Sequence, residues 1–431
     1  MSLCVASYTL GCKVNQYETE AILEEFFRDG FRLVPFKEKA DVYLVNTCTV
    51  TAKGERESKY AVRQAKRFNP RAKIIVTGCL VQTQRDELAG LPGVVLVAGN
   101  PEKEKILTLF KKALDSGKTQ ISVSDSPDRL TWDNLKIEKF HRHTRAFIKI
   151  QDGCDAGCHY CIVPRVRGKM ISRPLPAVKE EIRRLINYGF KEIVLTGIRL
   201  GKYGGDLNPG TTLAEVLEEV ENEPELLRIR LSSLEPGEFT PGLIRQIAGS
   251  RKICPHFHIP LQSGDNEILS RMGRNYTGEE YLSLIGEIKR LIPEASFSTD
   301  IMVGFPGEKE GHFLNTVDFL KNVGFNQLHI FTFSPRKLTL AANFPGQVPL
   351  SMKKNRSRRL HQLAEELKRN YRETQKDRTL EVLVEKKDKS GNLTGLTGNY
   401  VRLSFFGEAS LINQLVKVRI GEFTRAARVE N

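Results

Sequence analysis

The sequence predicts an α/β protein with three parts: an N-terminal doubly wound parallel sheet, a partial β/α barrel and a small C-terminal β-barrel. Up to residue 113, short apolar runs alternate with amphipathic helical patterns, which is typical of a parallel sheet. From residue 140, six further strand–helix units follow, as in an open β/α barrel. Beyond residue 375, short β-like runs alternate with the expected turn glycines Gly391, Gly395, Gly398 and Gly421, which favours a small barrel.

The first domain, residues 1–113, supplies four expected strands and two clear helical patterns. The strands are expected at 4–10, 41–45, 73–76 and 94–98, and the helices at 18–28 and 55–67. Residues 114–139 are polar, contain the single tryptophan and are typical of a linker.

The second domain, residues 140–374, has six expected strands, each followed by a helical pattern. The strands are expected at 147–150, 192–195, 229–231, 257–261, 297–303 and 327–333, and the helices at 177–188, 213–220, 241–248, 279–291, 313–323 and 351–372. The third domain, residues 375–431, has expected strands at 380–385, 399–406 and 415–420.

The charge of the chain suits a polyanionic partner. The formal net charge is +14, which fits nucleic acid, although a merely basic enzyme has the same property. No run is apolar for long enough to cross a membrane, and the N-terminus lacks the pattern of a signal peptide. We therefore expect a cytoplasmic protein whose eight cysteines are thiols, metal ligands or buried apolar groups.

Cys154, Cys158 and Cys161 form a C-x-x-x-C-x-x-C motif directly after the first barrel strand. Three thiolates on one loop can hold three irons of a cubane cluster and leave the fourth iron open for chemistry. Zinc would recruit a fourth ligand, and three unrelated cysteines would rarely lie within eight positions. The motif predicts a catalytic iron–sulfur site.

Cys12, Cys48 and Cys79 each follow an apolar run of the first domain by two or three small or polar residues. The carboxyl ends of parallel strands share one edge of a sheet, so the three thiols should converge. We expect a second three-thiolate cluster there. Cys4 lies within the first expected strand and Cys254 precedes the fourth barrel strand, and we interpret both as packing residues.

These motifs resemble those of the radical S-adenosylmethionine (SAM) superfamily and, over essentially the whole chain, the methylthiotransferase family. The residues that carry the family resemblance are T-L-G-C-K-V-N-Q at 9–16, N-T-C-T-V-T at 46–51 and C-I-V-P-R-V-R-G at 161–168. The first two are similar to the subgroup that acts on N6-threonylcarbamoyladenosine in tRNA.

The resemblance implies two 4Fe–4S clusters, SAM as cofactor and a TRAM β-barrel at the C-terminus. SAM cleaved at the Cys154 cluster would give a 5′-deoxyadenosyl radical, and the other cluster would present sulfur. The implied reaction adds a 2-methylthio group to the modified adenosine-37 in the anticodon stem-loop. Flavodoxin or ferredoxin is the implied electron donor. Two alternatives stay open: the same chemistry on isopentenyladenosine or a ribosomal-protein side chain, and a non-catalytic iron–sulfur RNA-binding protein.

The resemblance also implies a cofactor pocket at the strand-end loops. Its expected residues are Tyr160, Thr196, Gly197, Ser233, Glu235 and Gly304. Thr196 and Gly197 would approach the methionine amino group, Ser233 or Glu235 the ribose, and Gly304 the adenine. Arg199 and Leu338 depart from the family pattern and put the local pocket or a nearby loop in doubt.

Several basic and aromatic side chains are candidates for RNA contact. The basic ones are His141, Arg142, His143 and Arg145; Arg56, Lys59, Arg63, Lys66 and Arg67; and Lys353, Lys354, Arg356, Arg358 and Arg359. The aromatic candidates are Tyr400, Phe405 and Phe406, of which we expect at least one to be core.

Overall fold

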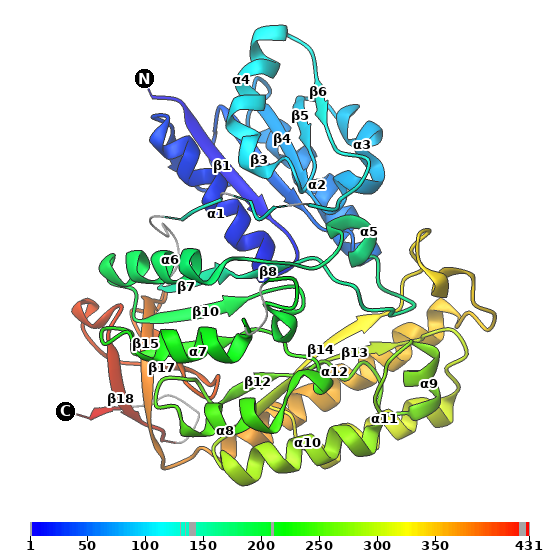
Figure 1. Cartoon of the computed structure of the whole chain (residues 1–431), viewed down its shortest axis with the longest axis vertical. Helices are drawn as coiled ribbons and strands as arrows, with labels where there is room; N and C mark the ends of the chain where they lie inside the picture. Colours follow the sequence, from blue (N-terminus) through cyan, green and yellow to red (C-terminus); the bar gives the residue numbers. More distant parts are fainter. Residues whose placement is uncertain are drawn as a thin grey trace.

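A computed structural model of the chain describes residues 2–129, 131–133, 135–137, 144–207, 211–421 and 428–430. The N-terminal domain stands on one side of a central barrel-like body, and a small sheet lies at one end of that body (Figure 1). Among the described residues, none of the helices combines the length and the apolar character that a membrane crossing requires.

The N-terminal domain is a six-stranded parallel sheet in the order β2-β1-β3-β4-β5-β6, with helices between its strands. Its strands are β1 (Cys4–Thr9), β2 (Arg32–Val34), β3 (Val42–Thr47), β4 (Lys73–Gly78), β5 (Val94–Ala98) and β6 (Gln120–Ser122). Its helices are α1 (Lys13–Arg28), α2 (Ala52–Phe68), α3 (Val81–Ala89), η1 (Lys103–Lys105) and α4 (Ile106–Ser116). The predicted parallel sheet is confirmed. The expected linker is partly wrong, because its β6 pairs with β5 as the edge strand.

The barrel-like body consists of two three-stranded parallel sheets, β7-β10-β11 and β12-β13-β14. A bridge between Ile229 and Ile253 links the two sheets, and β7 and β14 are the outer strands. The six strands are β7 (Arg145–Lys149), β10 (Glu192–Thr196), β11 (Arg228–Leu231), β12 (His256–His258), β13 (Ser296–Val303) and β14 (Gln327–Thr332). All six predicted strands are present in the predicted order.

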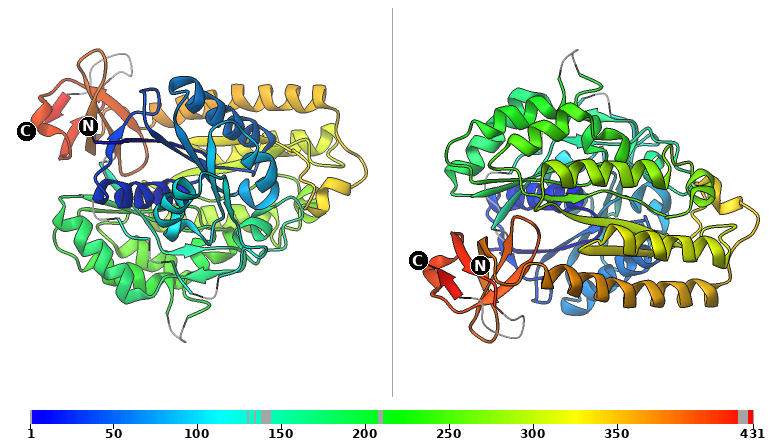
Figure 2. Two further views of the ribbon diagram at one scale, coloured as in Figure 1. Left: turned by 90° about the horizontal axis from the view of Figure 1, so that it is seen from above. Right: turned by 90° about the horizontal axis from the view of Figure 1, so that it is seen from below.

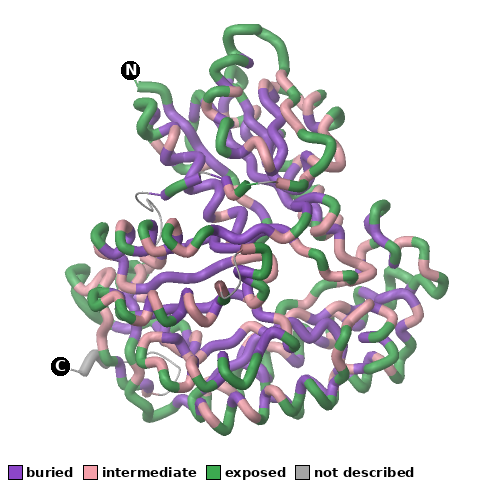
Figure 3. The backbone as a smooth tube through the Cα atoms, in the orientation of Figure 1, coloured by how far each residue is buried: buried purple, intermediate pink, exposed green. Residues whose placement is uncertain are grey.

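Helices cover the outside of these strands. They are α6 (Leu175–Asn187), α7 (Leu213–Glu221), α8 (Pro241–Gly249), α9 (Asn266–Arg271), α10 (Gly278–Leu291), α11 (Glu310–Val323) and α12 (Leu350–Glu373). The long α12 packs along β14 on one side of the body (Figure 2). The central strands of both larger units are buried, so the core lies between sheet and helices (Figure 3).

The C-terminal part is a five-stranded antiparallel sheet in the order β17-β16-β15-β18-β19. Its strands are β15 (Thr379–Lys387), β16 (Leu393–Thr397), β17 (Arg402–Phe405), β18 (Leu415–Arg419) and β19 (Arg428–Glu430). The expected closed barrel stays a prediction, because the described strands form an open order. Gly395 was expected in a turn, which is wrong, since it lies inside β16 and pairs with Leu403 and Val384.

Glu192 anchors the start of the barrel strands, and its loss should destabilise the fold. Its carboxylate is fully buried and lies 2.8 Å from Arg230 Nε, with Arg145 and Arg228 each 3.9 Å away. We expect Glu192→Ala to lower the free energy of unfolding by about 3–5 kcal/mol, because it leaves the buried Arg230 guanidinium without its carboxylate partner. Urea titration measures this change. Glu219→Ala, which breaks a half-exposed pair with Lys179, should cost at most about 1 kcal/mol; equal losses in both variants would contradict this account.

Candidate functional site

Cys12, Cys48 and Cys79 follow three neighbouring strands of the N-terminal sheet. β1 pairs with β3 and β3 with β4, all in parallel, so the three strand ends share one edge. The loops are tied together, since Leu10 N donates to Asn46 O (2.9 Å) and Cys79 N donates to Thr47 O (3.2 Å). The three thiols act electrostatically on one another. The predicted convergence of these cysteines is confirmed.

The environment of these thiols differs from that of ordinary core cysteines. Cys48 and Cys79 are buried, and burial raises the pKa of Cys48 to about 12. Cys12 caps the N-terminus of α1 and is accessible to solvent, yet burial also raises its pKa.

Cys154, Cys158 and Cys161 lie on the loop between β8 (Gln151–Asp152) and α5 (Val163–Arg167). Two donors point at the sulfurs: Ala156 N at Cys154 Sγ and Arg274 Nη1 at Cys158 Sγ, both at 3.4 Å. Burial raises the pKa of Cys161 to about 12. The loop presents three partly exposed thiols beside the carboxyl ends of the barrel strands.

The two groups of cysteines are neighbours across the domain boundary. Cys79 packs in one apolar cluster with Ile162 and Val166 of the segment that directly follows Cys161. Asn100, after β5, donates to Val166 O at 2.6 Å and lies 3.9 Å from Cys79 Sγ. The N-terminal sheet edge therefore rests on the loop of the second cysteine group.

The donor sets fit cubane clusters better than single ions. No group of three His, Cys, Asp or Glu side chains among the described residues could hold one metal ion. In a cubane each thiolate binds a different iron, so its ligands need not surround a single point. Because burial keeps the Cys48 and Cys161 thiols protonated, cluster binding would have to displace those protons. The residues present fit two cubane clusters.

The expected cofactor residues lie at the strand-end loops. Thr196 ends β10, and a β-carbon on Gly197 would meet Gln151 Oε1 at 2.9 Å. Tyr160 packs edge-on against Phe305. Ser233 is half-buried, and Glu235 is ion-paired with Arg274. That these residues together form a cofactor pocket stays a prediction.

The reason expected for Gly304 differs in the structure. Its φ is +73°, and the space beside its α-carbon is filled by the stem of Lys353. The close approach that requires glycine here is thus made by α12. Sequence reasoning also missed Gln151 and Arg274. Gln151 Oε1 accepts from Arg199 N, while its amide donates to Gly153 O of the cysteine loop.

The two departures from the family pattern have distinct surroundings. Arg199 pairs with Asp155 (2.6 Å), inside the cysteine loop, and with Glu238 (2.9 Å). It therefore braces the loop of Cys154. Leu338 is 52% exposed, and nothing in the structure explains a leucine at this position.

The basic RNA candidates differ in availability. Lys353 and Arg356 are buried and bind Phe333 O and Glu308, so they are not surface contacts. Three exposed arginines of α2 share one helix face with Tyr60, which is 59% exposed; they are Arg56, Arg63 and Arg67. Residues 141–143 lie outside the described part of the chain.

The three aromatic candidates of the C-terminal sheet have different surroundings. Phe405 is core, as expected for one of them, and Tyr400 stacks on His256 with ring centroids 4.1 Å apart. Phe406 is 76% exposed. Only Phe406 therefore presents most of its ring to solvent.

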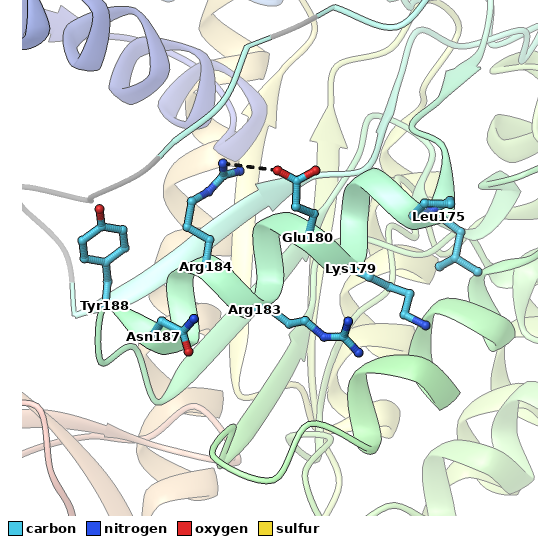
Figure 4. Close-up of a pocket in the computed structure, with 8 residues that line it drawn as sticks. Leu175, Lys179, Glu180, Arg183, Arg184, Asn187 and Tyr188 are labelled. Atoms are coloured by element: carbon cyan, nitrogen blue, oxygen red, sulfur yellow. Dashed lines mark ion pairs between the residues drawn. The ribbon is translucent and has the colours of Figure 1, made fainter.

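A hollow of about 750 Å³ lies on the outer face of α6, away from the cysteines (Figure 4). Its cations are already paired: Lys179 with Glu219, Arg183 with Glu223 and Arg184 with Glu180. Paired cations offer little to an anion, so this hollow is not a candidate site.

Comparison with known proteins identifies relatives for both larger units. Residues 4–99 match the family described as "Uncharacterized protein family UPF0004", and residues 148–320 match the Radical SAM superfamily. The threonylcarbamoyladenosine tRNA methylthiotransferase MtaB of Bacillus subtilis is 38% identical, over 99% of this chain and 97% of its own. The tRNA-2-methylthio-N(6)-dimethylallyladenosine synthase of Pelotomaculum thermopropionicum is 36% identical, over 95% and 93%.

A solved structure shares the fold. The radical S-adenosylmethionine methyltransferase TsrM of Kitasatospora setae superposes with a TM-score of 0.57 at 16% identity, covering 79% of this chain and 77% of its own. At this identity the similarity concerns the fold alone.

Proposed function

The chain belongs to the radical-SAM methylthiotransferase family, in the MtaB subgroup, and on this basis we propose that it adds a methylthio group to N6-threonylcarbamoyladenosine in tRNA. The observation that carries the proposal is the pairing of two three-cysteine groups across one domain boundary. One group supports radical formation from SAM and the other supports sulfur transfer. A non-catalytic RNA-binding protein would not need the two cysteine groups to lie side by side.

The proposed clusters are held by Cys154, Cys158 and Cys161 and by Cys12, Cys48 and Cys79. When bound, the two 4Fe–4S clusters and SAM would supply one-electron cleavage of the sulfonium and a sulfur-carrying iron. Arg274 stabilises negative charge on the sulfur of Cys158, and Ala156 N does so at Cys154. Thr196, Gly197, Ser233, Glu235 and Tyr160 then form the SAM pocket.

The proposed substrate partner is the anticodon stem-loop, with adenosine-37 as target. The exposed arginines of α2 fit phosphates, and Tyr60 between them offers a stacking surface. α2 begins four residues after Cys48, so RNA bound there would lie next to the sulfur-transfer site. The C-terminal sheet acts as a TRAM-type β-barrel with Phe406 as a contact.

The remaining proposals concern the domain boundaries, the electron donor and the cellular location of the enzyme. The first functional domain is the expected 1–113 extended through β6 to residue 122, followed by 140–374 and 375–431. The rest of the expected linker 114–139, residues 123–139, connects the first two domains. A flavodoxin or ferredoxin delivers the electrons, and the enzyme works in the cytoplasm.

Mass spectrometry of tRNA nucleosides from a deletion strain tests the proposed substrate. We expect loss of the 2-methylthio form of N6-threonylcarbamoyladenosine and accumulation of the unmethylthiolated nucleoside, because the acceptor is made independently. Complementation with the intact gene should restore the product. Loss of the methylthio-isopentenyl nucleoside instead would identify the alternative acceptor, and an unchanged profile would exclude both tRNA substrates.

A further inference from the structure

Arg167 joins the two cysteine groups through direct contacts. It ends α5, six residues after Cys161, and its side chain is 1% exposed. Its Nη1 donates to Asp152 Oδ1 (2.8 Å), two residues before Cys154, and to Glu18 Oε1 (3.1 Å). Its Nη2 donates to Glu18 Oε2 (3.1 Å) and to Asn15 Oδ1. Glu18 and Asn15 belong to α1, whose N-cap is Cys12.

Asn15 extends this contact to the loops of Cys12 and Cys48. Its side-chain amide donates to Leu10 O (2.7 Å) and to Thr47 O (3.1 Å). At the other end, Asp152 Oδ1 accepts from Gly153 N at 2.8 Å. One chain of hydrogen bonds thus runs from the Cys12 and Cys48 loops through Arg167 to the Cys154 loop.

Arg167 is part of a larger buried ionic cluster. Four cations meet three carboxylates, and all seven side chains are at most 6% exposed; they are Arg129, Lys149, Lys103 and Arg167 with Glu18, Asp152 and Asp133. Desolvation of so many charges is costly, and apolar side chains of similar size could fill the same space. The cluster therefore calls for a role besides stability.

The charge of Arg167 acts on the N-terminal thiols. It interacts electrostatically with Cys12, Cys48 and Cys79, and Glu18 and Asp152 fix its position. In a low-dielectric interior a cation at this place stabilises an anionic group held by the three thiolates. The more negative, reduced form of that group gains most.

We propose that Arg167 is a positioning residue of the N-terminal iron–sulfur site, which holds α1 against the Cys154 loop and raises the reduction potential of the N-terminal cluster. This inference rests on the proposed function, because it requires a cluster at Cys12, Cys48 and Cys79. Arg167 belongs to the radical-SAM segment, so a residue of that segment contributes charge at the N-terminal cysteine group.

The potential of the N-terminal cluster tests the proposal directly. In full-length protein with Cys154, Cys158 and Cys161 changed to alanine, only the N-terminal cluster should assemble, and EPR-monitored redox titration gives its potential. We expect R167Q to shift this potential to more negative values and R167K to leave it nearly unchanged, since lysine keeps the charge. R356Q, which breaks a buried Arg–Glu pair elsewhere, is the matched control and should give no shift.

A second pair of variants guards against misfolding of R167Q. The second pair compares E18Q with R167Q/E18Q, in which residue 18 carries no charge, so the loss of Arg167 leaves no ionised carboxylate at that position. The N-terminal cluster of R167Q/E18Q should again have a more negative potential than that of E18Q. Equal potentials within both pairs would overturn the role of Arg167 while leaving the proposed function intact. If the protein that keeps Arg167 but has Cys154, Cys158 and Cys161 changed to alanine bound no iron, the proposed function itself would be refuted.

Discussion

Changing Cys48 to alanine is expected to halve the iron content and to abolish the methylthio nucleoside, while release of 5′-deoxyadenosine from SAM continues. Reconstituted protein should hold about eight irons in two cubanes, and loss of one site should leave about four. Cys158→Ala should also leave about four irons, but it should abolish 5′-deoxyadenosine as well as product. Iron analysis and chromatography of anaerobic reactions with tRNA, SAM and reductant measure all three quantities.

The control for these variants is Cys254→Ala. Cys254 is buried like Cys48 and Cys79, but it lies before β12, away from both groups. It should keep about eight irons and both products. If Cys48→Ala kept its full iron content, the second cluster would have to lie elsewhere. If it lost 5′-deoxyadenosine formation, the division of labour between the two groups would be wrong.

The strand-end placement of the six cysteines was predictable, because it depends on local patterns. Each N-terminal cysteine follows an apolar run, and parallel strands bring their carboxyl ends to one edge. The pairing of β1, β3 and β4 confirms that reasoning. The short spacing of Cys154, Cys158 and Cys161 needed no tertiary information. That either group binds iron stays a prediction.

What the sequence could not predict are contacts between distant segments. In the sequence, Arg167 is only one position of the motif at 161–168, and its partner Glu18 lies 149 positions away. Gly304 was explained by a ligand, whereas Lys353 of α12 fills that space. Tyr400 was one of three candidates for stacking on RNA, but it stacks on His256 of the barrel. Such contacts depend on how the domains pack against each other, and the hydrophobic periodicity of a single segment does not predict that packing.

Gly153→Ala should remove the iron site of Cys154, Cys158 and Cys161 without unfolding the rest of the chain. Gly153 has a φ of +70°, where a β-carbon costs about 1–2 kcal/mol. That β-carbon would also collide with the backbone carbonyl of Lys169, which closes the other side of the loop. To relieve the collision, Gly153 must move away from Gly168, whose oxygen accepts the hydrogen bond of Cys154 N at 3.0 Å. The first ligand would then be displaced.

We therefore expect Gly153→Ala to retain about four irons, at the N-terminal site, and to release no 5′-deoxyadenosine. Gly157→Ala is the matched control in the same loop, since a β-carbon there meets nothing within 4 Å and its φ is not positive. It should keep about eight irons and full SAM cleavage. The irons retained in Gly153→Ala show that the N-terminal domain is folded, which separates local displacement from global unfolding. Full iron content in Gly153→Ala would mean that the loop tolerates the shift, and the tight backbone approach at Gly153 would not determine where Cys154 lies.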